Sequence, residues 1–262
     1  MSPRGAASAQ PAYVLHRYDW SESSLIIDLF SRDLGRLVVA AKGAKRPTSQ
    51  LRAVLRPFQR VQITLGRTAQ GAEVHNLRAA EWAGGVPVAG GEALFSGFYL
   101  NELLMKLLAR EDPHPALWDA YAATLAQLGS DAEAAALRAF ELRLLRETGS
   151  LPDLACVTAT QAGVQAQQRY RLCAEAGVVA APRGGDGAGN SAAGSIAGKE
   201  LLALGAALAA DDLAALQRAC GAPAVALRRQ LRELLAYHLG AAPLRTRQVL
   251  LDLQPLMQDP LR

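Results

Sequence analysis

Two apolar runs and the turn between them stand together in Ser24-Leu-Ile-Ile-Asp-Leu-Phe-Ser-Arg-Asp-Leu-Gly-Arg-Leu-Val-Val-Ala-Ala41. The runs at 24–30 and 36–41 have the length of short strands. The segment 31–35 between them carries Ser, Asp and Gly, which are common in tight turns. This stretch therefore predicts two consecutive β-strands joined by a turn.

Three further strands are predicted on either side of this pair. An apolar run at 13–18 precedes it, an alternating run at 58–65 follows it, and a fifth run covers 73–80. Five short strands with turn signals every ~8–12 residues favour a small barrel or a sandwich. The segment 49–56 has mixed signals and is expected to bridge the third and fourth strands.

The apolar pattern changes to helical spacing from about residue 91. The sequence therefore predicts an α+β chain of several domains, in which strands come first and helices follow. We expect a flexible tail at 1–12, a strand domain at 13–82 and a mainly α-helical domain at 83–262. The helices are expected at 92–109, 117–128, 132–147, 198–239 and 245–253, and a loop-rich insertion at about 153–197 is expected to hold a strand at Arg169–Cys173.

The composition is that of a globular chain with sizeable cores, because half of the 262 residues are hydrophobic. Cys156, Cys173 and Cys220 are widely spaced and form no Cys-x-x-Cys pair, so we expect neither a metal site nor a cofactor. An odd number of cysteines without a secretory signal indicates a reducing cytoplasm. The apolar run at 201–210 is too short to span a bilayer, so no membrane role is expected.

Positive charge is concentrated at the start of the chain. Residues 1–80 contain 12 Lys and Arg against 5 Asp and Glu, a net charge of +7, whereas the whole chain carries +4. Such asymmetry indicates a nucleic-acid or membrane surface in the basic part. A solvated basic face explains the charge equally well.

The third predicted strand runs directly into a cationic turn, in which Lys42, Lys45 and Arg46 flank Gly43. A strand that presents a flexible cationic tip suits a phosphate backbone better than a small molecule. Aromatic residues are interleaved with the basic positions of this region, as in grooves that bind single strands. These are Tyr13, Tyr18, Trp20 and Phe58, although packing in the core is the favoured alternative for Phe58. The candidate phosphate contacts are Arg17, Arg36, Lys42, Lys45, Arg46 and Arg52.

A second candidate site lies in the helical part. Leu137, Phe140 and Leu144 fall on one face of the helix predicted at 132–147, with Arg138 and Arg143 toward its edges. A hydrophobic groove rimmed by arginine suits an acidic, hydrophobic peptide. An ordinary amphipathic helix with a solvated rim gives the same pattern, so both interpretations stay open.

No arrangement of residues points to catalysis. The four histidines are scattered, and no nucleophile motif of the Gly-x-Ser-x-Gly type occurs. The string Gly194-Ser-Ile-Ala-Gly-Lys199 is one residue too short for a phosphate-binding loop, and Glu200 replaces the Ser or Thr that would bind magnesium. We therefore expect that the protein is not an enzyme.

Several segments resemble one family along nearly the whole chain. The opening Tyr13-Val-Leu-His-Arg-Tyr-Asp-Trp-Ser-Glu-Ser-Ser-Leu25 is similar to the first hairpin of RecO, the bacterial recombination mediator family. Further similar segments are Gly35-Arg-Leu-Val-Val-Ala-Ala-Lys-Gly-Ala-Lys-Arg46, Tyr99-Leu-Asn-Glu-Leu-Leu104, Leu137-Arg-Ala-Phe-Glu-Leu-Arg-Leu-Leu145 and Pro243-Leu-Arg-Thr-Arg247. The last is a variant of the family's basic Leu-x-Ser-Arg ending.

The resemblance implies an N-terminal five-stranded OB-fold barrel and a helical domain. It further implies a protein of the RecF pathway of DNA repair, near the bacterial nucleoid, that binds single- and double-stranded DNA and anneals complementary strands. Such proteins act with RecR and dock the acidic C-terminal tail of single-strand-binding protein, and so load RecA. Many members carry a small zinc module, but Cys156 and Cys173 stand alone here, so the insertion is expected to fold without metal.

One alternative from another class is kept. The chain would then be a protein-interaction scaffold whose basic face is only solvated and which has no direct role on DNA.

Overall fold

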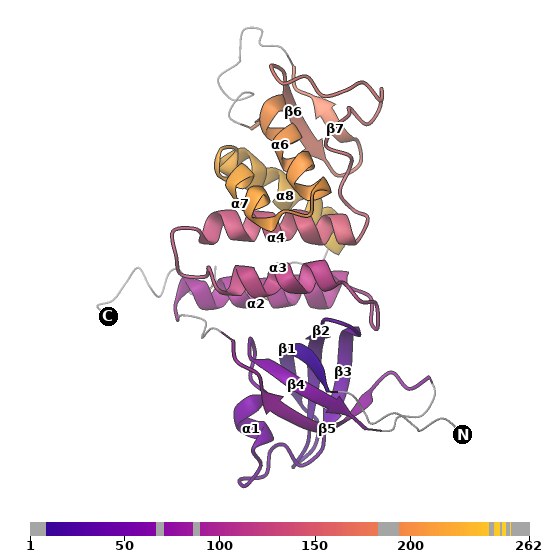
Figure 1. The fold of residues 1–262 in the computed structure, drawn as a ribbon, viewed down its shortest axis with the longest axis vertical. Coiled ribbons are helices and arrows are strands. Elements are labelled where there is room, and N and C mark those ends of the chain that lie inside the picture. The colour runs from indigo at the N-terminus through magenta and orange to yellow at the C-terminus, as the bar shows by residue number, and fades with distance from the viewer. Residues whose placement is uncertain are drawn as a thin grey trace. The chain divides into compact units, whose positions relative to one another are not determined.

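The computed structural model describes residues 9–66, 71–85, 90–182, 194–240, 244–246, 248, 249 and 252. The chain divides into two compact units (Figure 1). The first contains residues 1–129 together with 244–262, and the second contains residues 130–243. Within the described ranges, every helix is too short or too polar to span a bilayer.

The first unit is built on a closed barrel of five strands in the order β1-β2-β3-β5-β4. All neighbouring strands are antiparallel except β3 and β5, which run parallel. This order is that of an OB-fold, so the predicted five-stranded barrel is confirmed. The strands are β1 Gln10–Asp19, β2 Leu25–Ser31, β3 Gly35–Ala41, β4 Arg60–Leu65 and β5 His75–Trp82.

Strand β1 begins three residues earlier than predicted. Gln10, Pro11 and Ala12, which the sequence assigned to a flexible tail, pair with Ile63, Gln62 and Val61 of β4. Ala12 is fully buried in the barrel. The polar and small composition hid this pairing, because a strand residue is held by its backbone partner as well as by its side chain. Residues 1–8 of the predicted tail lie outside the described residues.

The barrel core follows the alternation of the strands. Leu25, Ile27 and Leu29 of β2 point inward, and Leu37, Val39 and Ala41 of β3 do the same. The bridging segment predicted at 49–56 contains the short helix α1, Leu51–Val54, whose Leu51 and Val54 pack against this core. The barrel is therefore filled by side chains.

Helices α2, Glu92–Leu107, and α3, Pro115–Leu125, belong to the same unit as the barrel. Aromatic contacts join them to it: the Phe58 ring lies 5.0 Å from that of Phe98, and Tyr13 lies 5.1 Å from Trp118. The compact units divide after Gly129, whereas 82/83 is the point at which the strands give way to helices. Helix α3 begins at Pro115, two residues before the predicted start, because proline is favourable in a first helical turn.

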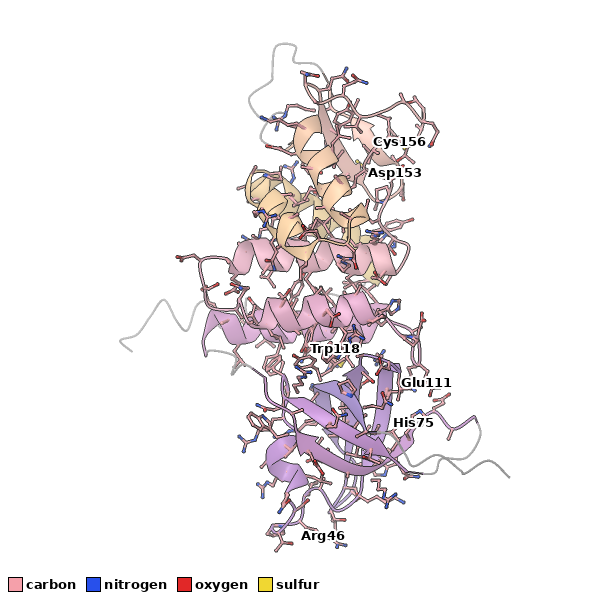
Figure 2. All side chains as sticks on the ribbon, in the orientation of Figure 1. Arg46, His75, Glu111, Trp118, Asp153 and Cys156 are labelled. Carbon is pink, nitrogen blue, oxygen red and sulfur yellow. The ribbon has the colours of Figure 1, made fainter. Side chains whose placement is uncertain are left out.

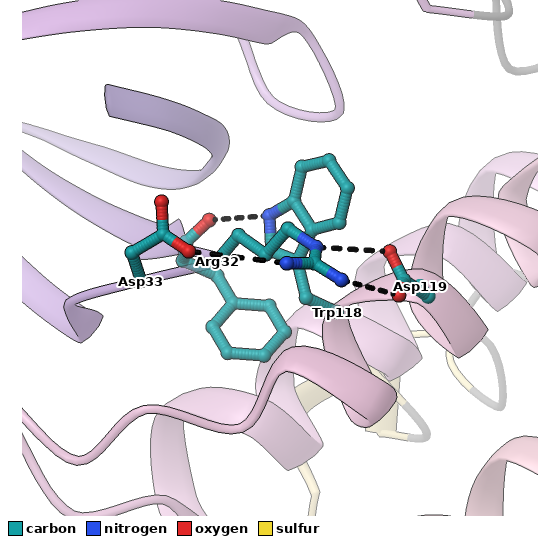
Figure 3. Close-up of polar contacts among 5 residues, drawn as sticks. Arg32, Asp33, Trp118 and Asp119 are labelled. Atoms are coloured by element: carbon teal, nitrogen blue, oxygen red, sulfur yellow. Dashed lines mark hydrogen bonds and ion pairs between the residues drawn. The ribbon is translucent and has the colours of Figure 1, made fainter. Parts of the chain in front are cut away.

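The turn between β2 and β3 is fixed to α3 (Figure 3). The Arg32 guanidinium contacts both carboxylate oxygens of Asp119, with Nε–Oδ1 at 3.3 Å and Nη2–Oδ2 at 3.0 Å. Beside it, the Trp118 indole donates a 3.1 Å hydrogen bond to the Phe30 carbonyl. The Arg32 side chain is therefore used in a contact between the β2–β3 turn and α3.

The second unit consists of helices and a small sheet at one end of them (Figure 1). Its helices are α4 Glu133–Glu147, α6 Gly198–Ala209, α7 Leu213–Gly221 and α8 Ala224–Leu239. Strands β6 Arg169–Cys173, β7 Gly177–Ala180 and β8 Ile196–Ala197 form a three-stranded sheet in the order β7-β6-β8. The predicted strand at Arg169–Cys173 is confirmed, and it pairs with β7 as a hairpin. Residues 183–193 of the insertion lie outside the described residues.

The predicted last helix, 245–253, falls only partly within the described residues. Arg245, Thr246, Gln248, Val249 and Asp252 have helical backbone, whereas 247, 250, 251 and 253 are outside the description.

Candidate nucleic-acid interface

The cationic turn forms a compact loop between β3 and α1. Gly43 has a φ of +72°, which favours glycine, and this bend is closed by a 3.1 Å hydrogen bond from the Arg46 amide to the Gly43 carbonyl. Ala44 is fully buried in the barrel core, so it anchors the loop from within. The side chains of Lys42 and Arg46 on either side of it are exposed. Figure 2 shows Arg46 at the end of the barrel away from α2 and α3.

Lys45 ties this loop to the turn between β1 and β2. Its backbone amide donates to the Ser23 carbonyl at 3.0 Å, and its Nζ lies 3.1 Å from the Ser21 carbonyl. The same Nζ is 3.4 Å from Asp19 Oδ2. The predicted phosphate contact Lys45 is thus used within the fold, where it brings the two loops together.

Four of the predicted cations remain exposed: Arg17, Lys42, Arg46 and Arg52. Their side chains make no hydrogen bond or ion pair to another described residue, so their charge is available to a ligand. Arg52 stands on α1, directly after the cationic loop, and Arg17 stands near the end of β1. We call these four residues, together with Trp20, the cationic end of the barrel.

Arg36 does not belong to the cationic end. Its side chain is only 15% exposed and forms an ion pair with Asp28, with Nη2–Oδ1 at 3.1 Å. Its Nη1 also donates to the carbonyls of Met105 and Leu108 in and after α2. The structure places Arg36 between the barrel and the end of α2, where its charge is matched within the protein.

The interleaved aromatic residues separate into two groups. Tyr13 and Phe58 are 4% and 7% exposed, so Phe58 is buried as the favoured interpretation predicts, but the two rings pack against α3 and α2 and not inside the barrel. Trp20 is 72% exposed and lies in the β1–β2 turn that Lys45 joins to the cationic loop. An exposed indole beside exposed cations can stack on a base while the cations contact phosphates. The sequence alone could not show that Phe58 is buried, because its burial depends on contact with Phe98 of α2, which is distant in sequence.

The second predicted site, on α4, is largely closed. Phe140 and Leu144 have no exposed surface, so they do not form the open groove that the sequence pattern suggests. The Arg143 guanidinium is 4% exposed and forms an ion pair with Asp211. Arg138, 12% exposed, lies 2.6 Å from Glu141 Oε1. Leu137 and Arg138 keep some exposure, and they are the accessible part of the predicted set.

The cysteines do not come together. All three are free, and the described residues contain no group of three or more His, Cys, Asp or Glu side chains that could hold a metal ion. Burial raises the pKa of the Cys220 thiol to about 12, so this thiol is protonated at neutral pH.

Comparisons with known proteins agree with the fold. The family models for the N-terminal and C-terminal parts of recombination protein O match residues 7–86 and 90–248. The chain is 50% identical over 253 residues to the DNA repair protein RecO of Polaromonas naphthalenivorans strain CJ2, covering 95% of this chain and 98% of that protein. It is 47% identical over 270 residues to the DNA repair protein RecO of Variovorax paradoxus strain S110, covering 98% and 100%.

Both family models and relatives at about half identity cover nearly the whole chain, and the barrel has the strand order expected of the first part. The chain therefore belongs to the RecO family of recombination repair proteins.

Proposed function

We propose that this chain is a recombination mediator that binds single- and double-stranded DNA at the cationic end of the barrel and anneals complementary strands. It acts without catalysis, together with RecR and single-strand-binding protein, and so promotes the loading of RecA. Family membership supports the role in recombination repair. The observation that carries the DNA contact is the grouping of four exposed cations with an exposed tryptophan.

This grouping fits a nucleic-acid strand for two physical reasons. Lys and Arg neutralise phosphates and release counterions, so they supply affinity without reading the sequence. A tryptophan face stacks on any base, and each stacked base is worth about 1–3 kcal/mol. A protein-interaction scaffold needs neither an exposed cation cluster nor an indole at the same loops, which is why it is the weaker alternative.

Replacement of Trp20 tests this function. We expect Trp20→Leu to weaken binding of a single-stranded oligonucleotide about fivefold or more, since about 1–3 kcal/mol of stacking is lost. Duplex DNA, whose bases are not available for stacking, should bind the variant nearly as well as it binds the wild type. The measurement is fluorescence anisotropy of labelled strands at low salt.

Trp82→Leu is the matched control, because Trp82 is also well exposed, at 65%, and lies away from the cationic loop. Its indole donates a 3.1 Å hydrogen bond to Gln59 Oε1. If the wild-type protein binds neither single-stranded nor duplex DNA at low salt, the result would favour the protein-interaction scaffold. Equal losses in the Trp20 and Trp82 variants would remove stacking at Trp20 from the proposal.

We further infer that the acidic C-terminal tail of single-strand-binding protein meets the chain at Leu137 and Arg138. Arg138 already holds a carboxylate, since its Nη2 lies 2.6 Å from Glu141 Oε1. A guanidinium placed this way can share its remaining donors with a carboxylate of the tail through charge-assisted hydrogen bonds. Leu137 supplies an adjacent apolar contact on the same helix.

A labelled tail peptide distinguishes this site from the other basic helix face of the unit. Arg138→Ala should weaken binding of the peptide about tenfold or more, because hydrogen bonds to charged groups contribute roughly 1.5–3 kcal/mol. Arg228 and Arg232 are exposed on α8, so Arg228→Ala/Arg232→Ala serves as the comparison. If the α8 variant loses the peptide and Arg138→Ala retains it, the tail docks on α8.

A further inference from the structure

The Glu102 carboxylate on α2 holds the segment Leu244–Thr246, which is distant in sequence. Its Oε1 accepts a 2.8 Å hydrogen bond from the Arg245 amide, and its Oε2 accepts from the Thr246 amide at 2.9 Å. The Thr246 hydroxyl adds a third hydrogen bond of 2.6 Å to Oε2. One side chain therefore binds two consecutive backbone amides, in the manner of a cap at the start of a helix.

The preceding residue of α2, Asn101, fixes this arrangement against β1. Asn101 is 1% exposed; its Nδ2 donates to the Leu15 carbonyl at 2.7 Å, and its Oδ1 accepts from the Tyr121 hydroxyl at 2.5 Å. Glu102 follows Asn101 directly, so the segment that it holds lies close to the middle of β1. This position agrees with the pKa values of His16 and Tyr18, on which burial has the largest effect and which the Arg245 charge lowers.

The Arg245 side chain is exposed, and its guanidinium makes no hydrogen bond or ion pair within the described part of the chain. The Glu102 side chain, which holds the Arg245 backbone, is only 9% exposed. Its charge is matched by Lys106, whose Nζ lies 3.1 Å from Glu102 Oε1. The backbone of Arg245 is thus fixed while its charge is left to face outward. Strand β1 leads from this point through exposed Arg17 to Trp20 at the cationic end.

We propose that Arg245 is a second anchor for the phosphodiester backbone, and that Glu102 is the positioning residue that places it beside β1. A DNA strand bound at the cationic end would then continue from Arg17 along β1 to Arg245. The inference rests on the proposed function, because it extends the same DNA surface. It joins to the barrel a cation from a part of the chain that lies far from the barrel in sequence.

Replacement of Glu102 gives a test with a definite sign. Glu102→Gln removes a negative charge and leaves Lys106 without that partner, so simple electrostatics predicts tighter DNA binding. Loss of the double cap predicts the opposite, since the Arg245 charge is no longer held beside β1. We expect the variant to bind a labelled single-stranded oligonucleotide about threefold more weakly at low salt.

Arg245→Ala is expected to weaken binding of the same oligonucleotide about fivefold. The slope of log affinity against log salt concentration should become smaller by about 0.7, the value for one phosphate contact on a single strand. In the double variant, Glu102→Gln should add no further loss, because its effect acts through Arg245. A general weakening of the fold would instead add to the loss. Arg218→Ala, which removes an exposed charge from α7 in the second unit, is the matched control.

The outcomes separate the two levels of the argument. If the wild type shows no salt-dependent binding, the proposed function itself fails. If the wild type binds and the cationic-end variants lose affinity while Arg245→Ala does not, only the second anchor is overturned. Tighter binding by Glu102→Gln overturns the positioning role. Should Glu102→Gln lower the stability of the whole chain, Arg245→Ala decides the question, because it changes an exposed side chain.

Discussion

The triple variant Lys42→Ala/Arg46→Ala/Arg52→Ala is expected to bind single-stranded DNA about 10- to 100-fold more weakly than the wild type at low salt. Its affinity should also depend less on salt, with a slope smaller by about 2, since each phosphate contact on a single strand contributes about 0.7. The three side chains are exposed and make no hydrogen bond or ion pair to another described residue, so their removal leaves the barrel intact. The measurement is a binding titration at several salt concentrations.

Lys45 is left unchanged in this variant for a structural reason. Its Nζ contacts the Ser21 carbonyl and Asp19, so its loss would separate the two loops and confuse a binding effect with a folding effect. The control removes three exposed charges from the second unit, with Arg171→Ala/Lys199→Ala/Arg218→Ala. Equal losses in the two triple variants would show that net charge alone sets the affinity and would contradict the assignment of the cationic end.

Gly35→Ala is expected to destabilise the first unit by about 3 kcal/mol. Gly35 has a φ of +73°, and a Cβ at this position would overlap the backbone of Asp112 in the connection between α2 and α3. The contact cannot be relieved by a side-chain rotation, because Asp112 meets it with backbone atoms. Backbone strain and steric overlap therefore act together. Chemical unfolding followed by circular dichroism measures the loss.

Gly71→Ala separates these two contributions. Gly71 also has a positive φ, +78°, but a Cβ there would meet nothing within 4 Å. We expect it to cost only about 1 kcal/mol, the strain of the left-handed backbone. If both variants lose the same stability, the close approach of Gly35 to Asp112 is not what holds the hairpin against the helices.

The barrel was open to prediction from sequence because its strands are local patterns. The apolar alternation in β2 and β3 and the turn between them are read within a few residues, and these patterns correspond to the inward positions Leu25, Ile27, Leu37 and Val39. The start of β1 was missed for the opposite reason. Gln10–Ala12 are held by pairing with β4, some 50 residues away, which no local pattern reveals.

The sequence could not show which arginines are exposed and which are paired within the protein. Arg36 and Arg46 look alike as basic residues near a strand end, yet Arg36 is matched by Asp28 and by carbonyls about 70 residues away, whereas Arg46 is exposed. Likewise, the helix pattern at 132–147 located α4, but it could not show that Phe140 and Leu144 are fully buried. Charge and periodicity indicate which residues are candidates, and long-range packing decides which of them a ligand can reach.

The bond from Glu102 to Arg245 spans 143 positions of the chain, and the first unit contains residues from both sides of the second. A chain emerging from the ribosome therefore releases all of residues 130–243 before it can close this contact. Early segments generally fold first during translation, so we expect the barrel to form before residues 244–246 reach the Glu102 carboxylate. The capture of residues 244–246 is then a late step in biogenesis, and a nascent chain arrested before that point would present the barrel without Arg245.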